Sequence, residues 1–161
     1  MRRARSHDVD AMAAVHRDAV VTGYAGLVPP EAPAPSVERL CAEWERALGE
    51  ADATVLVAQA GGHVVGMVMV RPDPDFPGCG QLRRLNIAPT RWGQGIGARL
   101  HDEALRLLSE AGFETAGLWV LEGNRRARAM YKRRGWSLVP GATLEWSGLG
   151  VVEVRYSRSM R

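Results

Sequence analysis

The stretch that decides the fold of this chain lies at residues 85–97. It reads Leu85-Asn86-Ile87-Ala88-Pro89-Thr90-Arg91-Trp92-Gly93-Gln94-Gly95-Ile96-Gly97. An apolar strand, expected at residues 81–87, runs here into a glycine-rich turn that opens a helix at residues 95–111. Glycines let backbone N–H groups approach a ligand, and the first N–H groups of a helix are unpaired at its positive end. The stretch therefore predicts a phosphate or pyrophosphate site, with a purely structural turn as the alternative.

The same stretch also satisfies a dinucleotide-binding fingerprint, in the form Gly93-x-Gly95-x-x-Ala98. Two features argue against an NAD(P)-binding Rossmann-type protein. That fingerprint follows its strand directly, whereas residues 88–92 intervene here. It also requires further strand–helix–strand units, and only residues 136–161 follow the last expected helix. The Rossmann reading is therefore the less favoured alternative.

Outward from this stretch, the hydrophobic pattern predicts a mixed α/β protein. The other expected helices and strands are, in chain order, helices at residues 8–24 and 36–49, a hairpin of strands at 54–60 and 64–71, a strand at 116–121, a helix at 124–134, and strands at 136–139 and 151–156. The hairpin turns at Gly61-Gly62, and the proline-rich segment 72–80 is expected to be a loop.

Length and composition indicate one globular domain over residues 1–161. Hydrophobic residues make up 46% of the chain and charged residues 24%, which is ordinary for a folded protein. Cys41 and Cys79 form no metal-binding pattern, so we expect reduced thiols and no metal site. We find neither a signal peptide nor an apolar run of about 18 residues, so we expect a cytoplasmic protein without a membrane partner.

A second motif follows at residues 124–136. It reads Asn124-Arg125-Arg126-Ala127-Arg128-Ala129-Met130-Tyr131, followed by Gly135-Trp136. Its Asn, Ala and Tyr fall on one helical face, although an N-capping Asn and a buried Tyr would have the same spacing. Together the two motifs resemble the GNAT family of N-acetyltransferases, whose patterns are Q/R-x-x-G-x-G/A and N-x-x-A-x-x-x-Y…G-F/W. Trp92 stands where the family has Gln or Arg, and Arg91, Arg125, Arg126 or Arg128 are candidates to replace that contact.

The resemblance implies one domain with a central mixed, mostly antiparallel sheet, about four flanking helices, and a splay between the fourth and fifth strands. It also implies acetyl-CoA as cofactor, with its pantetheine arm in the splay and its pyrophosphate on the glycine turn. The residues that it assigns to acetyl-CoA are Leu85, Asn86, Ile87, Trp92, Gly93, Gln94, Gly95, Ile96, Gly97, Ala98, Asn124, Ala127 and Tyr131.

The implied reaction is direct transfer of the acetyl group to a primary amine. Tyr131 is the candidate acid that protonates the leaving thiolate. Gln81 cannot act as the base, so Glu122 is the first candidate, with Glu145 and Glu153 as weaker ones. The acceptor pocket is expected to include Tyr24, Trp44, Trp146 and Glu153. A small-molecule amine or antibiotic is favoured slightly over a peptide N-terminus.

Two other classes stay open at this point. A non-catalytic acyl-CoA-binding or sensing module would keep the glycine turn but needs no base. A nucleic-acid binder is suggested by the basic run at residues 125–134, but that run lacks interleaved aromatic residues, so no nucleic-acid partner is expected. Analogy with the family also suggests a homodimer.

Overall fold

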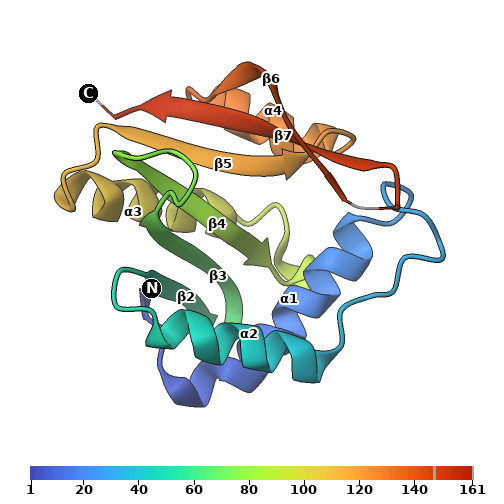
Figure 1. Ribbon diagram of the computed structural model, residues 1–161. Helices are drawn as coiled ribbons and strands as arrows, with labels where there is room; N and C mark the ends of the chain where they lie inside the picture. Colours follow the sequence, from blue (N-terminus) through green and yellow to red (C-terminus); the bar gives the residue numbers. More distant parts are fainter. Residues whose placement is uncertain (147, 161) are drawn as a thin grey trace.

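Seven strands form one sheet in the computed structural model, which describes residues 1–146 and 148–160 (Figure 1). The strands are β1 (Arg2–Arg3), β2 (Thr54–Ala60), β3 (His63–Pro72), β4 (Cys79–Ile87), β5 (Thr115–Leu121), β6 (Ser137–Trp146) and β7 (Val151–Ser159), and the α-helices are α1 (Val9–Gly23), α2 (Val37–Gly49), α3 (Ile96–Glu110) and α4 (Arg125–Arg133). Their order in the sheet is β1-β2-β3-β4-β5-β7-β6. No helix among the described residues combines the length and apolar character needed to cross a membrane.

The sheet has a hydrophobic core on each face, because successive side chains of a strand point to opposite sides. In β3, Met67 and Met69 pack with residues of α1 and α2, including Trp44. Val68 and Val70 pack with α3 and with the aromatic residues around α4. Figure 1 shows α1 and α2 together below the sheet, with α3 and α4 on its other side. The near-continuous apolar run of β3 thus reflects burial on both faces.

The one parallel pairing in the described sheet joins β4 to β5, and it is short. It extends over three residue pairs, from Cys79 with Thr115 to Gln81 with Gly117. Beyond Gln81 the two strands have no register and diverge, while the remaining pairings are antiparallel. The expected fold class is confirmed, including the splay between the fourth and fifth strands.

Strand β4 contains a β-bulge at Arg84 and Leu85, between the point where β4 leaves β5 and the glycine turn. Met67 pairs with Asn86 but Met69 pairs with Arg83, so β4 has one residue more than β3 in this interval. Arg84 lies there with a φ of 53°, and among the described residues no other non-glycine residue has a positive φ. The bulge turns the backbone of β4 locally. The bulge could not be predicted from the sequence, because Arg has no preference for this conformation.

Strand β6 is longer than the expected segment 136–139. It continues to Trp146, although Pro140 and Gly141 interrupt its pattern. The register with β7 shifts between Leu138 and Thr143, so the proline lies in an irregular segment of an edge strand, where it costs no ladder hydrogen bond.

Candidate functional site

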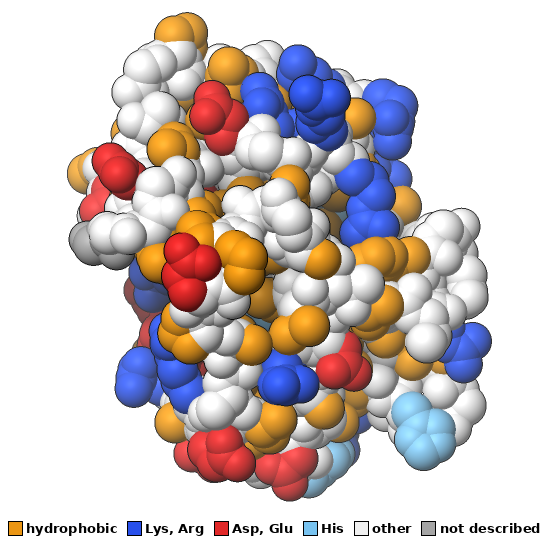
Figure 2. All heavy atoms as spheres, turned by 90° about the vertical axis from the view of Figure 1, so that its right-hand side faces the viewer, with side chains coloured by type: hydrophobic (Ala, Val, Ile, Leu, Met, Phe, Trp, Pro, Cys, Tyr) orange, Lys and Arg blue, Asp and Glu red, His pale blue; other side chains and the backbone are white. Residues whose placement is uncertain are grey.

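A cavity of about 820 Å³ opens where β4 and β5 part. Residues from α1, β3, β4, the glycine turn, α3, β5, α4, β6 and β7 line it, whereas β1, β2 and α2 do not contribute. Figure 2 shows one side of the molecule, where hydrophobic side chains lie across the middle and basic side chains gather at the upper right, over α4. The volume falls in the range of small-molecule and cofactor sites.

The glycine turn adopts the backbone conformation that its sequence predicts. Gly93 has a φ of 78° and Gly95, the N-cap of α3, has a φ of 74°. Both line the cavity, together with the first residues of α3. Helix N-terminal N–H groups have no intrahelical partner, so this end of the cavity presents unpaired donors and a positive dipole. The turn has the features of an anion site.

Trp92 has a structural role within the turn. Its indole Nε1 donates a hydrogen bond of 2.8 Å to the carbonyl oxygen of Ile87, which ties the turn to the end of β4. The guanidinium of Arg126 lies over its ring, with Cζ 3.8 Å from the ring centroid. The indole N–H is therefore already used, and the stacked guanidinium is the positive charge at this position.

Two of the four arginines considered for this position line the cavity. They are Arg91 and Arg126. Arg128 instead donates to the Tyr156 hydroxyl at 3.1 Å and to the Glu122 carbonyl oxygen at 2.7 Å. Arg125 does not line the cavity.

Helix α4 brings its predicted face to the cavity. Asn124 caps the helix by accepting a hydrogen bond of 3.1 Å from the Ala127 N–H, and both residues line the cavity. Tyr131 also lines it but is only 7% exposed. Burial raises the pKa of the Tyr131 phenol, and the nearby Tyr24 adds to that rise. The phenol is therefore protonated at neutral pH.

Glu153 of β7 lines the cavity across the splay from β4. Burial raises its pKa, whereas a hydrogen bond with Trp146 and the charge of Arg83 lower it. Tyr24 lies beside it: burial, with a smaller contribution from Glu153, raises the pKa of Tyr24 to about 12. The rings of Tyr24 and Trp146 are 6.4 Å apart. The Glu153 carboxylate is half-buried, and the side chain of Trp146 donates a hydrogen bond to it.

The cavity brings together most of the residues predicted from the sequence. Those that line it are Tyr24, Leu85, Asn86, Ile87, Trp92, Gly93, Gly95, Ile96, Gly97, Ala98, Asn124, Ala127, Tyr131 and Glu153. Gln94 instead lines a separate depression of about 180 Å³ and donates to the Thr90 carbonyl oxygen at 3.5 Å.

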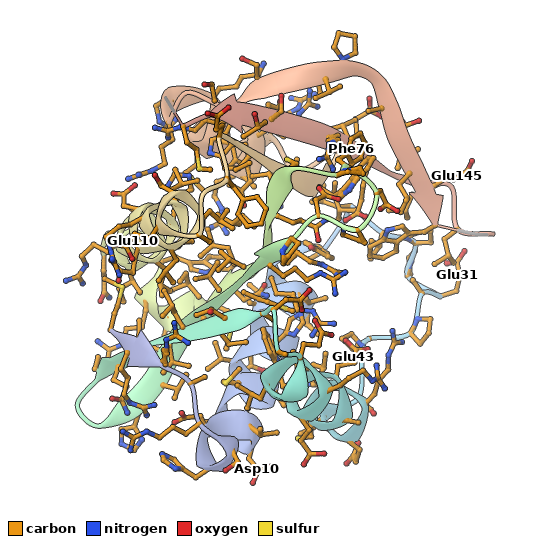
Figure 3. All side chains as sticks on the ribbon, turned by 60° about the vertical axis from the view of Figure 1, so that its left-hand side comes forward. Asp10, Glu31, Glu43, Phe76, Glu110 and Glu145 are labelled. Atoms are coloured by element: carbon orange, nitrogen blue, oxygen red, sulfur yellow. The ribbon has the colours of Figure 1, made fainter. Side chains whose placement is uncertain are left out.

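Besides Gln94, four of the predicted residues do not line the cavity. Trp146 lies next to it, with its ring beside that of Tyr24. Trp44 is fully buried in the core beneath α2, because the apolar stripe of that helix faces the sheet. Glu122 is exposed after the end of β5 and does not line the cavity. Glu145 is exposed and lies at the outer end of β6 (Figure 3). The cavity thus holds one of the three carboxylates considered as bases, Glu153.

Three arginines line the cavity although the sequence did not identify them as site residues: Arg71, Arg83 and Arg84. Paired arginines within a short apolar strand were the available signal, since charged residues are rare in strands that are covered on both faces. The bulge at Arg84 explains how two consecutive arginines both reach the cavity.

Comparison with known proteins gives matches over most of the chain. Residues 12–136 match the sequence profile of the Acetyltransferase (GNAT) family. The chain is 28% identical over 165 residues to a Mycobacterium tuberculosis protein described as a probable N-acetyltransferase, covering 97% of this chain and 91% of that protein.

Solved structures show the same fold. One is the PaiA N-acetyltransferase of Thermoplasma acidophilum in complex with coenzyme A, with a TM-score of 0.76, 21% identity and coverage of 98% and 96% of the two chains. Another is the ribosomal-protein-alanine N-acetyltransferase of Brucella melitensis, with a TM-score of 0.77, 22% identity and coverage of 99% and 98%.

Proposed function

Because the chain belongs to the Acetyltransferase (GNAT) family, we propose that it transfers an acetyl group from acetyl-CoA to a primary amine, by direct attack within a ternary complex. The observation that carries this proposal is the single cavity in which the glycine turn, the split strands, Tyr131 and Glu153 meet. Each is a part that amine acetylation requires, and they come from distant segments of the chain.

The residues of the cavity fit acetyl-CoA. Gly93, Gly95 and the first turn of α3 would hold the pyrophosphate, with Arg126 beside them. Beyond Gln81 the edge of β4 that faces β5 is unpaired, so its backbone groups at Leu85–Ile87 are available to the amides of a pantetheine arm. A bound acetyl-CoA supplies a thioester whose carbonyl carbon accepts the amine and whose thiolate is the leaving group.

Glu153 and Tyr131 divide the proton transfers between them. Glu153 accepts a proton from the ammonium group of the acceptor, which frees the nitrogen lone pair for the new C–N bond. Tyr131 donates its phenolic proton to the sulfur as the C–S bond breaks with its electron pair on sulfur. The second proton that the nitrogen loses restores the phenol. The products are then the amide, CoA as a thiol, and one proton on Glu153 that solvent removes.

The test measures thiol release from acetyl-CoA over a panel of primary amines. We expect Tyr131→Phe to lower kcat about tenfold or more while the Kd for acetyl-CoA stays unchanged. Tyr156→Phe is the matched control, because Tyr156 is another buried tyrosine of the same core cluster and does not line the cavity. The control is expected to keep kcat.

Two outcomes would contradict the proposal. Equal kcat values for wild type and Tyr131→Phe would remove the tyrosine from proton transfer. Tight acetyl-CoA binding with no CoA released from any amine would identify the chain as an acyl-CoA-binding module instead.

A further inference from the structure

The charged residues of the cavity wall are mostly basic. Six arginines line it, namely Arg71, Arg83, Arg84, Arg91, Arg126 and Arg133, and its two acidic residues are Asp75 and Glu153. Arg91, Arg126 and Arg133 lie near the glycine turn and α4, where a cofactor's phosphates would be. The other three come from β3 and β4, before the turn. We call Arg71, Arg83, Arg84 and Glu153 the charged wall.

Two arginines of the charged wall are neutralised by carboxylates of α2 and the residue after it. Arg84 forms an ion pair of 2.8 Å with Glu43, and Arg71 forms one of 3.1 Å with Glu50. Figure 3 shows Glu43 on α2, on the helix side of the sheet. Arg83 forms no ion pair with any carboxylate in residues 1–146 and 148–160. Arg83 is therefore the arginine of the charged wall whose positive charge no carboxylate neutralises.

Arg83 and Glu153 lie on the same face of the sheet, on opposite sides of the splay. Arg83 pairs in register with Met69, which packs beneath α1 and α2, and cross-strand partners share a face. Glu153 precedes Val154, which belongs to the core on the α3 side, so the carboxylate points to the α1–α2 face as well. Each charge shifts the pKa of the other group, yet the two form no ion pair. Both groups line the cavity, and among the described residues neither has an ion-pair partner.

We propose that the acceptor is a primary amine that carries a carboxylate, with its carboxylate on Arg83 and its amine on Glu153. A guanidinium is the side chain best suited to bind a carboxylate, through two parallel hydrogen bonds. The inference rests on the proposed acetyl transfer, because it places the reacting nitrogen at the base. Arg83 is then a specificity-determining residue and has no part in the proton transfers.

The same charges disfavour polycationic acceptors such as aminoglycosides or polyamines. Glu153 can hold one ammonium group, but any further ammonium group would meet the arginines of the charged wall. Asp75 is the other acidic residue of the cavity, and it is exposed on the loop between β3 and β4. The charges of the cavity therefore disfavour acceptors that carry more than one positive charge.

The test compares amino acids with their matched amides and decarboxylated amines, in wild type, Arg83→Gln and Arg83→Lys. In wild type we expect kcat/KM for the carboxylate form to exceed that of its neutral partner about ten- to one-hundred-fold, as for one charge-assisted contact. Arg83→Gln abolishes this preference by raising the KM of the carboxylate form, while Arg83→Lys restores part of it. The KM for acetyl-CoA stays constant throughout. Arg46→Gln, at an exposed arginine of α2, is the control.

Binding is measured in parallel by calorimetry, with CoA present and no acetyl group to transfer. Heat of binding for carboxylate-bearing amines in wild type but not in Arg83→Gln supports the assignment, even if no acetyl transfer occurs and the proposed reaction fails. Preferential acetylation of polyamines, or an unchanged carboxylate preference in a folded Arg83→Gln protein, would overturn it.

Discussion

The buried ion pair between Asp73 and Arg155 gives a prediction whose size follows from the structure. Arg155 Nη2 lies 2.7 Å from Asp73 Oδ2, and the two side chains are 3% and 0% exposed. The guanidinium is stacked on Phe76, with Cζ 3.4 Å from the ring centroid, and also faces Trp119. Asp73 further accepts the Asp75 N–H at 3.1 Å. The pair therefore fixes the loop between β3 and β4, which forms part of the cavity rim, to β7.

Replacing Asp73 by Ala leaves a buried guanidinium without its counter-charge. Loss of one partner of a buried ion pair costs about 3–5 kcal/mol. Arg155 Nη1 already has no hydrogen-bond partner, and without Asp73 the Nη2 group would keep only its 3.8 Å contact with the Cys79 sulfur. For a chain of this length, such a change lowers the Tm by about 6–20 °C, at 2–4 °C for each kcal/mol.

The assay is urea unfolding followed by circular dichroism, with thermal melting as a second measurement. Glu110→Ala is the control, since it removes an exposed carboxylate paired with Arg106 on α3 and is expected to cost about 0.5 kcal/mol or less. The double variant Asp73→Ala/Arg155→Met is expected to be more stable than Asp73→Ala alone, because it no longer buries an unpaired charge.

A loss below about 1 kcal/mol in Asp73→Ala would refute this reasoning, because it would mean that the guanidinium is solvated or paired otherwise. A double variant that is less stable than either single one would refute it as well, because the cost would then lie in lost packing.

Two further predictions concern the cavity. Gly95→Ala and Gly112→Ala both place Ala at positive φ, at 74° and 87°, so each is expected to cost about 1–2 kcal/mol of stability. Only Gly95→Ala should weaken CoA binding, measured by calorimetry, because Gly112 follows α3 at the end away from the glycine turn. Equal CoA affinity in both variants would remove the turn from cofactor binding. Burial raises the pKa of Glu153, so kcat/KM of the wild type should fall as the pH drops through that pKa and the base becomes protonated. Glu153→Gln should lose about a hundredfold in kcat together with this acid limb. Glu122→Gln, the exposed control, should keep both, and a pH profile unchanged in Glu153→Gln would exclude Glu153 as the base.

The local parts of the site could be predicted from the sequence. The glycine turn, the start of α3 and the capped helix α4 each depend on residues within a few positions of one another, namely Gly93 and Gly95 at positive φ and Asn124 bonded to the Ala127 N–H. Such features follow from backbone sterics and from the unpaired groups of helix ends, which neighbouring residues satisfy.

Other features depended on how distant segments pack. Glu122 and Glu153 are both acidic residues in or next to strands, and only the antiparallel pairing of β5 with β7 places Glu153 in the cavity while Glu122 stays exposed. The stacking of Arg126 on Trp92 likewise joins residues 34 positions apart. Burial and charge partners are properties of tertiary contacts, so they decide which carboxylate lines the cavity and which arginine has no ion-pair partner.

The sequence by itself determined that a glycine turn at the start of a helix offers backbone donors to an anion, because that geometry is local. Only the tertiary structure decided which side chains face the anion site across the splay. The bulge at Arg84 and the partners of Arg71 and Arg84 leave Arg83 unpaired opposite Glu153, and that arrangement depends on contacts between strands and helices far apart in the chain.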